Sequence, residues 1–330
     1  MRAYLRRHHP AALPILVLLA LAGAACVAAS AGTAPAPEPT PMAAADARPA
    51  FDSSRAFEHI RQLVAIGPRP PGSAGIAQTR AYVAKQIGAM GLTLTEQAFT
   101  ADTPLGPIRM VNLIVRIPGA GPDRILLSGH YDTKLVREFR FVGANDAGSS
   151  TAMLIELARA LKDRRSPFTI DIVFFDGEEA LVEWVGSDHT YGSRHFVAQA
   201  RTDGTLHTIR AIVNVDMVGD RDLRIRREAA STPWLTDIIW AAARRLGHAR
   251  HFVDEVQPVE DDHVPFLQAG VPAANIIDMD YPPWHTADDT LDQVSARSLQ
   301  VVGDVVLAAL PDIEAHLRKL DSARRGSAPR

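Results

Sequence analysis

The chain has 330 residues, of which 47% are hydrophobic and 22% are charged, a composition typical of a globular protein. The formal net charge is −3 and no basic stripe with interleaved aromatic residues is present, so no nucleic-acid partner is expected. No pattern indicates an obligate interface, so a monomer is expected. The single cysteine, Cys26, lies near the N-terminus, so the folded domain has no disulfide and depends on its packed core.

The first 50 residues differ in composition from the rest. Residues 1–31 begin with arginines, continue with an apolar run and end in small residues, which is the arrangement of an export signal. Cleavage near "ASAG", an uncleaved anchor, and a lipoprotein signal that tethers the protein to a membrane through Cys26 all remain open. Residues 32–50 are rich in Pro and Ala and are expected to form a disordered linker. We therefore predict an exported protein, periplasmic or extracellular.

The folded domain is expected to cover residues 51–320, with a disordered tail at 321–330. Apolar residues at helical spacing predict helices, and short apolar or alternating runs predict strands. The predicted helices are 52–64, 73–90, 149–163, 191–200, 232–247 and 295–313. The predicted strands are 92–101, 108–119, 124–132, 169–176, 209–219 and 272–279.

From residue 124 onward, the predicted strands and helices alternate, and the strands are apolar on both faces. Such strands occur in largely parallel sheets that are covered by helices on both sides. We therefore predict a single α/β domain with three layers, α/β/α, around a mostly parallel mixed central sheet.

Residues that can bind a metal or move a proton follow the carboxyl ends of the predicted strands. They are His130, Asp132, Glu178, Glu179, Asp216 and His285. Open α/β sheets place their ligand sites at this edge, so these side chains are expected to meet. Asp146, in "GANDAGSS", lies at the start of the following helix, where a carboxylate is favoured.

Taken singly, each of these residues has an ordinary structural explanation. Asp146 can be a helix cap, and "GEEA" can be a solvated turn. Their coincidence at the strand ends of one sheet favours a zinc site, because zinc binds imidazole nitrogen and carboxylate oxygen. The adjacent Glu178 and Glu179 can then have different functions, one as a ligand and the other as an unbound general acid and base.

Longer segments resemble the M28 metallopeptidase superfamily, and within it the animal-type, zinc-dependent glutaminyl-peptide cyclotransferases more than the aminopeptidases. The similarity extends from about residue 57 to 310. "GHYD", "NDAG" and "GEE" are shared by the superfamily. The cyclase-like segments are "EEALVEW" with its final Trp, "YGSRH", "DDHVPF" and "PWHT". The resemblance implies a zinc aminopeptidase-like fold and peptide or protein N-termini as substrates.

The resemblance also implies a set of metal ligands. Asp146, Glu179 and His285 match the positions that hold the single catalytic zinc of the cyclases. In two-metal aminopeptidases, the positions of His130 and Asp216 carry a second metal, and that of Asp146 bridges the two. One zinc is expected for a cyclase and two for an aminopeptidase.

The remaining roles follow from the same resemblance. Glu178 matches the glutamate that moves the proton, and Asp216 and Asp261 match carboxylates that form hydrogen bonds near it. Trp184 and Trp284 match residues that shape the substrate pocket.

Three functions are compatible with these residues. The favoured one is cyclisation of N-terminal glutamine to pyroglutamate with release of ammonia. The alternative is a secreted zinc aminopeptidase of the same family. A non-catalytic binding domain is disfavoured, because neither a ligand nor Glu178 is missing.

The sequence departs from the cyclases at two places. Asn275 occupies a position where those enzymes usually have histidine, and the loop "IIDMDYPP" is about one residue shorter. Both changes are expected to alter the wall of the pocket and with it the substrate preference.

Overall fold

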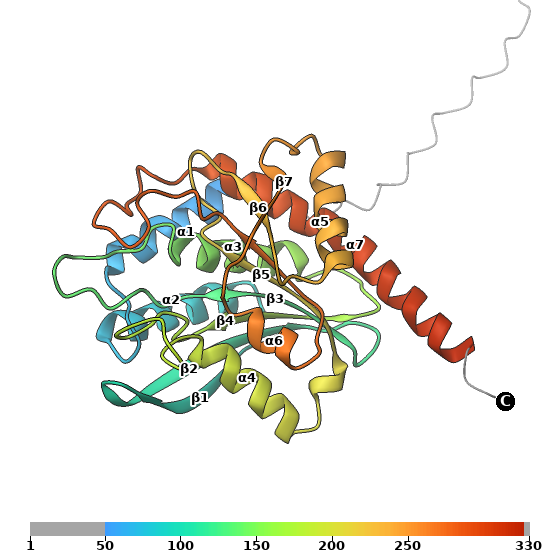
Figure 1. The fold of residues 1–330 in the computed structure, drawn as a ribbon, viewed down its shortest axis with the longest axis horizontal. Coiled ribbons are helices and arrows are strands. Elements are labelled where there is room, and N and C mark those ends of the chain that lie inside the picture. The colour runs from blue at the N-terminus through green and yellow to red at the C-terminus, as the bar shows by residue number, and fades with distance from the viewer. Residues whose placement is uncertain (1–49, 327–330) are drawn as a thin grey trace, which may run out of the picture. The chain divides into compact units, whose positions relative to one another are not determined.

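The computed structural model describes residues 50–326 (Figure 1). The predicted export signal (1–31), the linker (32–50) except its last residue, and residues 327–330 of the tail lie outside the described residues. Within residues 50–326, no helix has the length and apolar character needed to span a membrane.

The helices and strands alternate along most of the chain. The helices are α1 (Ser53–Ile66), α2 (Ala74–Ala89), α3 (Gly148–Leu161), α4 (Tyr191–Thr202), α5 (Pro233–Arg245), α6 (Val264–Gln268) and α7 (Ala296–Gly326), with a 3-10 turn at Leu206–Thr208. The strands are β1 (Leu94–Thr103), β2 (Gly106–Ile117), β3 (Arg124–His130), β4 (Thr169–Phe175), β5 (Ile209–Asp216), β6 (Ile225–Glu228), β7 (Phe252–Gln257) and β8 (Ala273–Ile277).

The central sheet has six strands in the order β1-β2-β4-β3-β5-β8. β3 pairs in parallel with β4 and β5, and β5 pairs in parallel with β8. β1 and β2 add an antiparallel hairpin at one edge. The carboxyl ends of β3, β4, β5 and β8 therefore meet along one edge of the sheet, which is the edge where ligand sites form.

Helices cover both faces of this sheet (Figure 1). Along β3, Ile125 and Leu127 pack into the larger apolar cluster with α1, α3, α5 and α7, whereas Leu126 packs into a second cluster with Phe196 of α4 and Phe266 of α6. Successive residues of a strand point to opposite faces, so one apolar strand contributes to two cores. The predicted three-layer α/β/α fold is confirmed.

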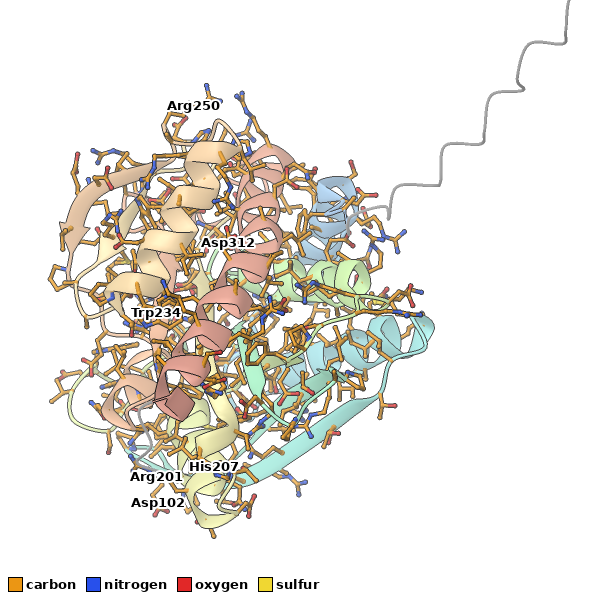
Figure 2. The ribbon with its side chains drawn as sticks, turned by 90° about the vertical axis from the view of Figure 1, so that its right-hand side faces the viewer. Asp102, Arg201, His207, Trp234, Arg250 and Asp312 are labelled. Atoms are coloured by element: carbon orange, nitrogen blue, oxygen red, sulfur yellow. The ribbon has the colours of Figure 1, made fainter. Side chains whose placement is uncertain are left out.

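The long helix α7 lies beside α5 (Figure 2), on the sheet face that carries the larger apolar cluster. Arg245 of α5 pairs there with Asp312 of α7 at 2.6 Å. The prediction that a disordered tail begins at residue 321 is wrong for residues 321–326, because α7 continues to Gly326. Arg210 of β5 holds Asp321 in this last part, with its Nη2 2.5 Å from Asp321 Oδ1. This long-range ion pair has no signal in the local sequence.

The sequence did not predict β6, β7 or α6. β6 and β7 form a separate two-stranded parallel sheet, and their sequences, "IRRE" and "FVDEVQ", are rich in charged residues. Ion pairs join them, for example Arg226 Nε to Glu255 Oε2 at 2.9 Å. Such strands lack the apolar alternation by which strands are recognised.

The burial of His59 between α1 and α2 makes the stability of the fold depend on pH. Its side chain is buried, and its Nδ1 lies 2.7 Å from the hydroxyl of Tyr82 in α2. Burial lowers the pKa of His59 to about 4, whereas an unfolded histidine titrates near 6.5. The unfolded state therefore binds more protons in this range, and stability falls as the pH drops from about 6.5 to about 4.

We expect this single group to account for about 2–3 kcal/mol of the acid-induced loss in the free energy of unfolding. His59→Gln should remove that part of the pH dependence in urea denaturation, whereas the exposed His207→Gln (Figure 2) should leave it in place. Identical pH profiles for His59→Gln and the unsubstituted protein would contradict the assignment.

Candidate active site

The acidic residues and histidines at the strand ends come together in two groups. One group contains His130, Asp146 and Asp216, and the other contains Asp146, Glu179 and His285. In each group one ligand atom per residue lies within 4.8 Å of the others. Asp146, from the loop before α3, belongs to both groups.

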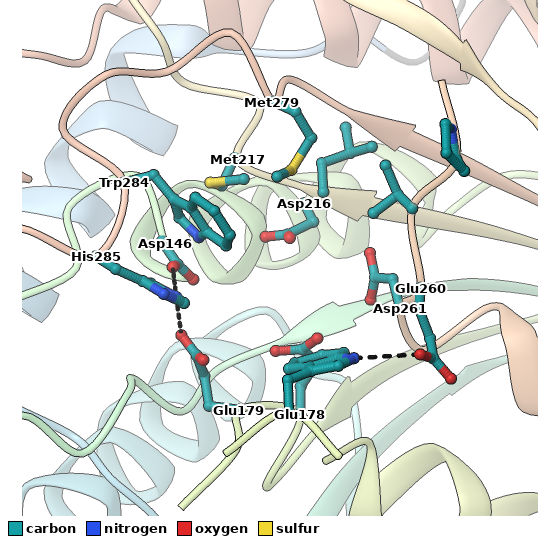
Figure 3. Close-up of a pocket in the computed structure, with 14 residues that line it drawn as sticks. Asp146, Glu178, Glu179, Asp216, Met217, Glu260, Asp261, Met279, Trp284 and His285 are labelled. Carbon is teal, nitrogen blue, oxygen red and sulfur yellow. Dashed lines mark hydrogen bonds and ion pairs between the residues drawn. The ribbon is translucent and has the colours of Figure 1, made fainter. Parts of the chain in front are cut away.

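In the second group, His285 Nε2 lies 3.2 Å from Asp146 Oδ2 and 3.0 Å from Glu179 Oε1 (Figure 3). Burial raises the pKa of Glu179, and the charge of Asp146 raises it further. Burial opposes the charge of His285, but hydrogen bonds to Asp146 and Glu179 raise its pKa to about 9. Two buried carboxylates beside one imidazole need a compensating positive charge.

The donor set of this group suits zinc. It offers two carboxylates and one imidazole, and a catalytic zinc takes three such ligands and keeps a fourth position open. Glu179 Oε2 is buried without a hydrogen-bond partner, and the nearest ion-pair partner, Lys134 Nζ, is 3.7 Å away. Asp146, Glu179 and His285 therefore fit a zinc ion.

The first group is held together by His130. Its Nε2 lies 3.1 Å from Asp216 Oδ1 and 3.2 Å from Asp146 Oδ1, and its Nδ1 lies 3.5 Å from Asp132 Oδ1. Burial opposes protonation, but the charges of Asp216 and Glu178 raise the pKa of His130 well above its ordinary value. This group can hold a second cation or, without one, an imidazolium ion among carboxylates.

Glu178 lies beside these groups and does not belong to either. Its side chain lines the same cavity as Asp216 and Asp261 (Figure 3). Burial raises the pKa of Glu178 well above its ordinary value, and the charge of Asp261 raises it further against the effect of His130. Burial also raises the pKa of Asp216 to about 7. The raised pKa values of Glu178 and Asp216 favour retention of a proton on one of these two neighbouring carboxylates.

The cavity has a volume of about 350 Å³ and combines a polar floor with apolar walls. Its apolar lining comes from Trp184, Met217, Pro258, Val259, Ile277, Met279 and Trp284. Trp284 is 43% exposed at the opening, and its ring centre lies 4.3 Å from that of the adjacent His285.

The backbone is strained at two residues of the site. Met217 and His285 have positive φ angles of 45° and 55°, and such strain is common at functional sites.

Two carboxylates that received no role from the sequence orient the site. Asp132 accepts hydrogen bonds from the backbone N–H groups of Glu178 and Glu179, at 3.1 and 3.3 Å. Asp289 accepts hydrogen bonds from the N–H groups of Asn145 and Asp146, at 2.8 and 3.1 Å. Asp132 was expected at the site from its place at a strand end, although without a specific role, whereas Asp289 stands far from its partners in the sequence and has no such signal.

Arg69, in the "GPRPPGS" segment, was also missed. Its side chain is fully buried, and its guanidinium donates to the carbonyls of Val142 and Gly143 at 2.7 and 2.9 Å. It therefore supports the loop that carries Asp146. Burial lowers the pKa of Arg69 to about 10, so it remains a cation at neutral pH.

Arg69→Met is expected to lower the free energy of unfolding by about 3 kcal/mol or more, because buried carbonyls lose their charged donor. The variant should also bind zinc more weakly, since the loop before Asp146 loses its support. Urea denaturation and zinc analysis test both effects. Arg61→Met, on the exposed side of α1, is the control and should change stability by less than about 0.5 kcal/mol. Wild-type stability in the Arg69 variant would contradict this role.

Asn275 does not lie where the sequence suggested. It is buried behind Asp261, to whose Oδ2 it donates a hydrogen bond of 2.7 Å, and Asn214 donates to the same oxygen at 3.1 Å. The expectation that Asn275 alters the pocket wall is therefore wrong, since β8 directs it beneath the wall. Met279, from the shortened loop, does line the cavity.

With this geometry established, comparison with known proteins identifies the family. The model of peptidase family M28 matches residues 112–310. The chain belongs to peptidase family M28. The resemblance inferred from the motifs is thereby confirmed.

Relatives of this M28 chain include cyclases and an aminopeptidase. A glutaminyl-peptide cyclotransferase-like protein of Mus musculus is 32% identical over 261 residues, which cover 70% of this chain and 68% of that protein. The crystal structure of an Acidobacteriales bacterium glutaminyl cyclase is 40% identical with a TM-score of 0.78, covering 87% of this chain and 100% of the other. A leucine aminopeptidase precursor from Bacteroides thetaiotaomicron is 26% identical with a TM-score of 0.73, covering 79% of this chain and 97% of the other.

Proposed function

We propose that this protein is a zinc-dependent glutaminyl-peptide cyclotransferase, an acyltransferase that converts N-terminal glutamine of peptides to pyroglutamate and releases ammonia. The observation that carries the proposal is the cavity in which Glu178 lies beside the Asp146–Glu179–His285 group, between the walls formed by Trp184 and Trp284. The similarity to the Acidobacteriales glutaminyl cyclase, which extends over that entire chain, supports it.

The proposed reaction forms one bond and breaks another at the side-chain amide carbon of the substrate. A zinc ion bound by Asp146, Glu179 and His285 would supply Lewis-acid polarisation of the amide carbonyl. As the substrate's α-amine bonds to the amide carbon, Glu178 accepts a proton from that amine. Glu178 then donates the proton to the departing amide nitrogen, which leaves as ammonia, and Glu178 returns to its starting state.

Neighbouring residues support this proton transfer. Asp216 and Asp261 lie in the same cavity as Glu178 and are proposed to keep the moving proton within hydrogen-bond reach. Trp184 and Trp284 are proposed to exclude water and to hold the glutamine side chain folded toward its own α-amine. The attack is intramolecular, so this positioning supplies much of the rate enhancement.

The alternative function is that of an M28 zinc aminopeptidase. The His130–Asp146–Asp216 group favours it, because this group could hold a second metal next to the first. Glu178 would then take a proton from a water molecule in place of the substrate amine.

Cellular location is proposed from the sequence. We propose that residues 1–31 direct export to the periplasm or the extracellular space, with a membrane tether through Cys26 in the lipidated form. The proposed partners are peptide or protein N-termini, and the protein is proposed to act as a monomer.

Mass spectrometry tests the function directly. The zinc-loaded protein is incubated with a peptide that begins with Gln and, separately, with one that begins with Leu. A cyclase removes one ammonia from the Gln peptide and leaves the Leu peptide intact. Release of a free N-terminal residue from either peptide would overturn the proposal in favour of the aminopeptidase.

A further inference from the structure

Glu260 lies at the opening of the cavity. It lines the cavity next to Asp261, and Figure 3 shows it across the cavity from Trp284 and His285. The side chain of Glu260 is 52% exposed, whereas that of Glu178 is only 7% exposed. A peptide whose first residue reaches Glu178 extends toward the exposed end of the cavity, where Glu260 supplies a half-exposed carboxylate.

The charge of Glu260 is not neutralised by the protein. Its Oε2 accepts a hydrogen bond from Trp184 Nε1 at 3.3 Å, and its Oε1 lies 3.9 Å from His189 Nε2. Burial lowers the pKa of His189, so this ring is neutral at pH 7. Within residues 50–323, no lysine or arginine lines the cavity or forms an ion pair with Glu260.

The carboxylate is also held in a fixed place. The indole of Trp184 stacks on His189, with ring centres 4.3 Å apart and an angle of 10° between the planes. On the other side, the loop that carries Glu260 is anchored by a buried contact of 2.9 Å between Glu228 and His263. A fixed, half-exposed carboxylate beside the Trp184 indole in the cavity lining suits a cationic side chain, since an aromatic face also attracts cations.

We infer that Glu260 makes this site prefer peptides with lysine or arginine directly after the N-terminal glutamine. The inference rests on the proposed cyclase function and adds the substrate class to it. Half-exposed ion pairs have small effects, so we expect kcat/KM to be about threefold to tenfold higher for a Gln-Lys peptide than for a Gln-Glu peptide.

The test compares three peptides that begin with Gln-Lys, Gln-Ala and Gln-Glu and are otherwise identical. Ammonia release by the zinc-loaded enzyme gives kcat/KM for each, at low and at high salt. The expected order is Lys, Ala, Glu, and the difference should shrink in high salt because the pair is exposed. Glu260→Gln should abolish the difference, whereas the matched variant of the exposed Glu183, Glu183→Gln, should retain it.

Two negative results are distinguishable. Conversion of all three peptides at equal rates by the unsubstituted enzyme, or a preference that survives Glu260→Gln, overturns the inference and leaves the cyclase function intact. Conversion of none of the peptides overturns the proposed function, and the inference with it.

Discussion

Glu178→Gln is expected to lower kcat for an N-terminal glutamine peptide by about 10²- to 10⁴-fold, the usual contribution of a general acid and base. Glutamine keeps the size of the side chain and one acceptor oxygen, but its amide cannot accept the proton from the substrate amine. Glu178 belongs to neither metal group, so zinc content should stay at the wild-type level. The rate of ammonia release at saturating peptide gives kcat, and metal analysis of the purified variant gives the zinc content.

Glu183→Gln is the matched control for this experiment. Glu183 lies in the same loop region, is exposed and does not line the cavity, so its substitution should leave kcat unchanged. Loss of zinc along with activity in Glu178→Gln would make Glu178 a metal ligand, contrary to the proposed role. Full activity in that variant would move the proton transfer to another group, such as Asp216.

The central layers of the fold could be predicted because local sequence determines them. β3 and β4 are buried along their whole lengths, and their apolar runs were sufficient to recognise them. α3 follows β3 along the chain and packs against it in the larger apolar cluster, which is the arrangement that alternating strands and helices predict. β6 and β7 could not be predicted in this way, because charge pairs across an exposed surface hold them together.

The site was predictable where its residues lie at strand ends. His130 and Asp216 end β3 and β5, and Glu178 lies shortly after β4. These three strands are adjacent and parallel, so topology alone brings the residues together. Asp289 and Arg69 could not be found in this way. Their partners are backbone groups of the loop before α3, 73 positions from Arg69 at Val142 and 143 positions from Asp289 at Asp146. A hydrogen bond to a backbone group leaves no residue pattern at the other end.

His285→Ala is expected to lower zinc affinity by more than about 100-fold and to abolish turnover, because only two carboxylates of the ligand group remain. The wild-type protein should bind one zinc ion per chain. Zinc at about 1,000 times its Kd should then stabilise the fold by about 4 kcal/mol, an effect that His285→Ala should lose. Metal analysis and thermal unfolding with and without zinc provide readouts that do not depend on activity.

His130→Gln distinguishes one metal from two. If the His130–Asp146–Asp216 group holds no metal, this variant should retain one zinc ion and most of the stabilisation by zinc, although Asp216 loses its buried imidazole partner. Two zinc ions in the wild type, with one lost in His130→Gln, would assign that group to a second metal. Glu178 would then face a pair of metals, an arrangement that activates water, and the aminopeptidase alternative would replace the cyclase.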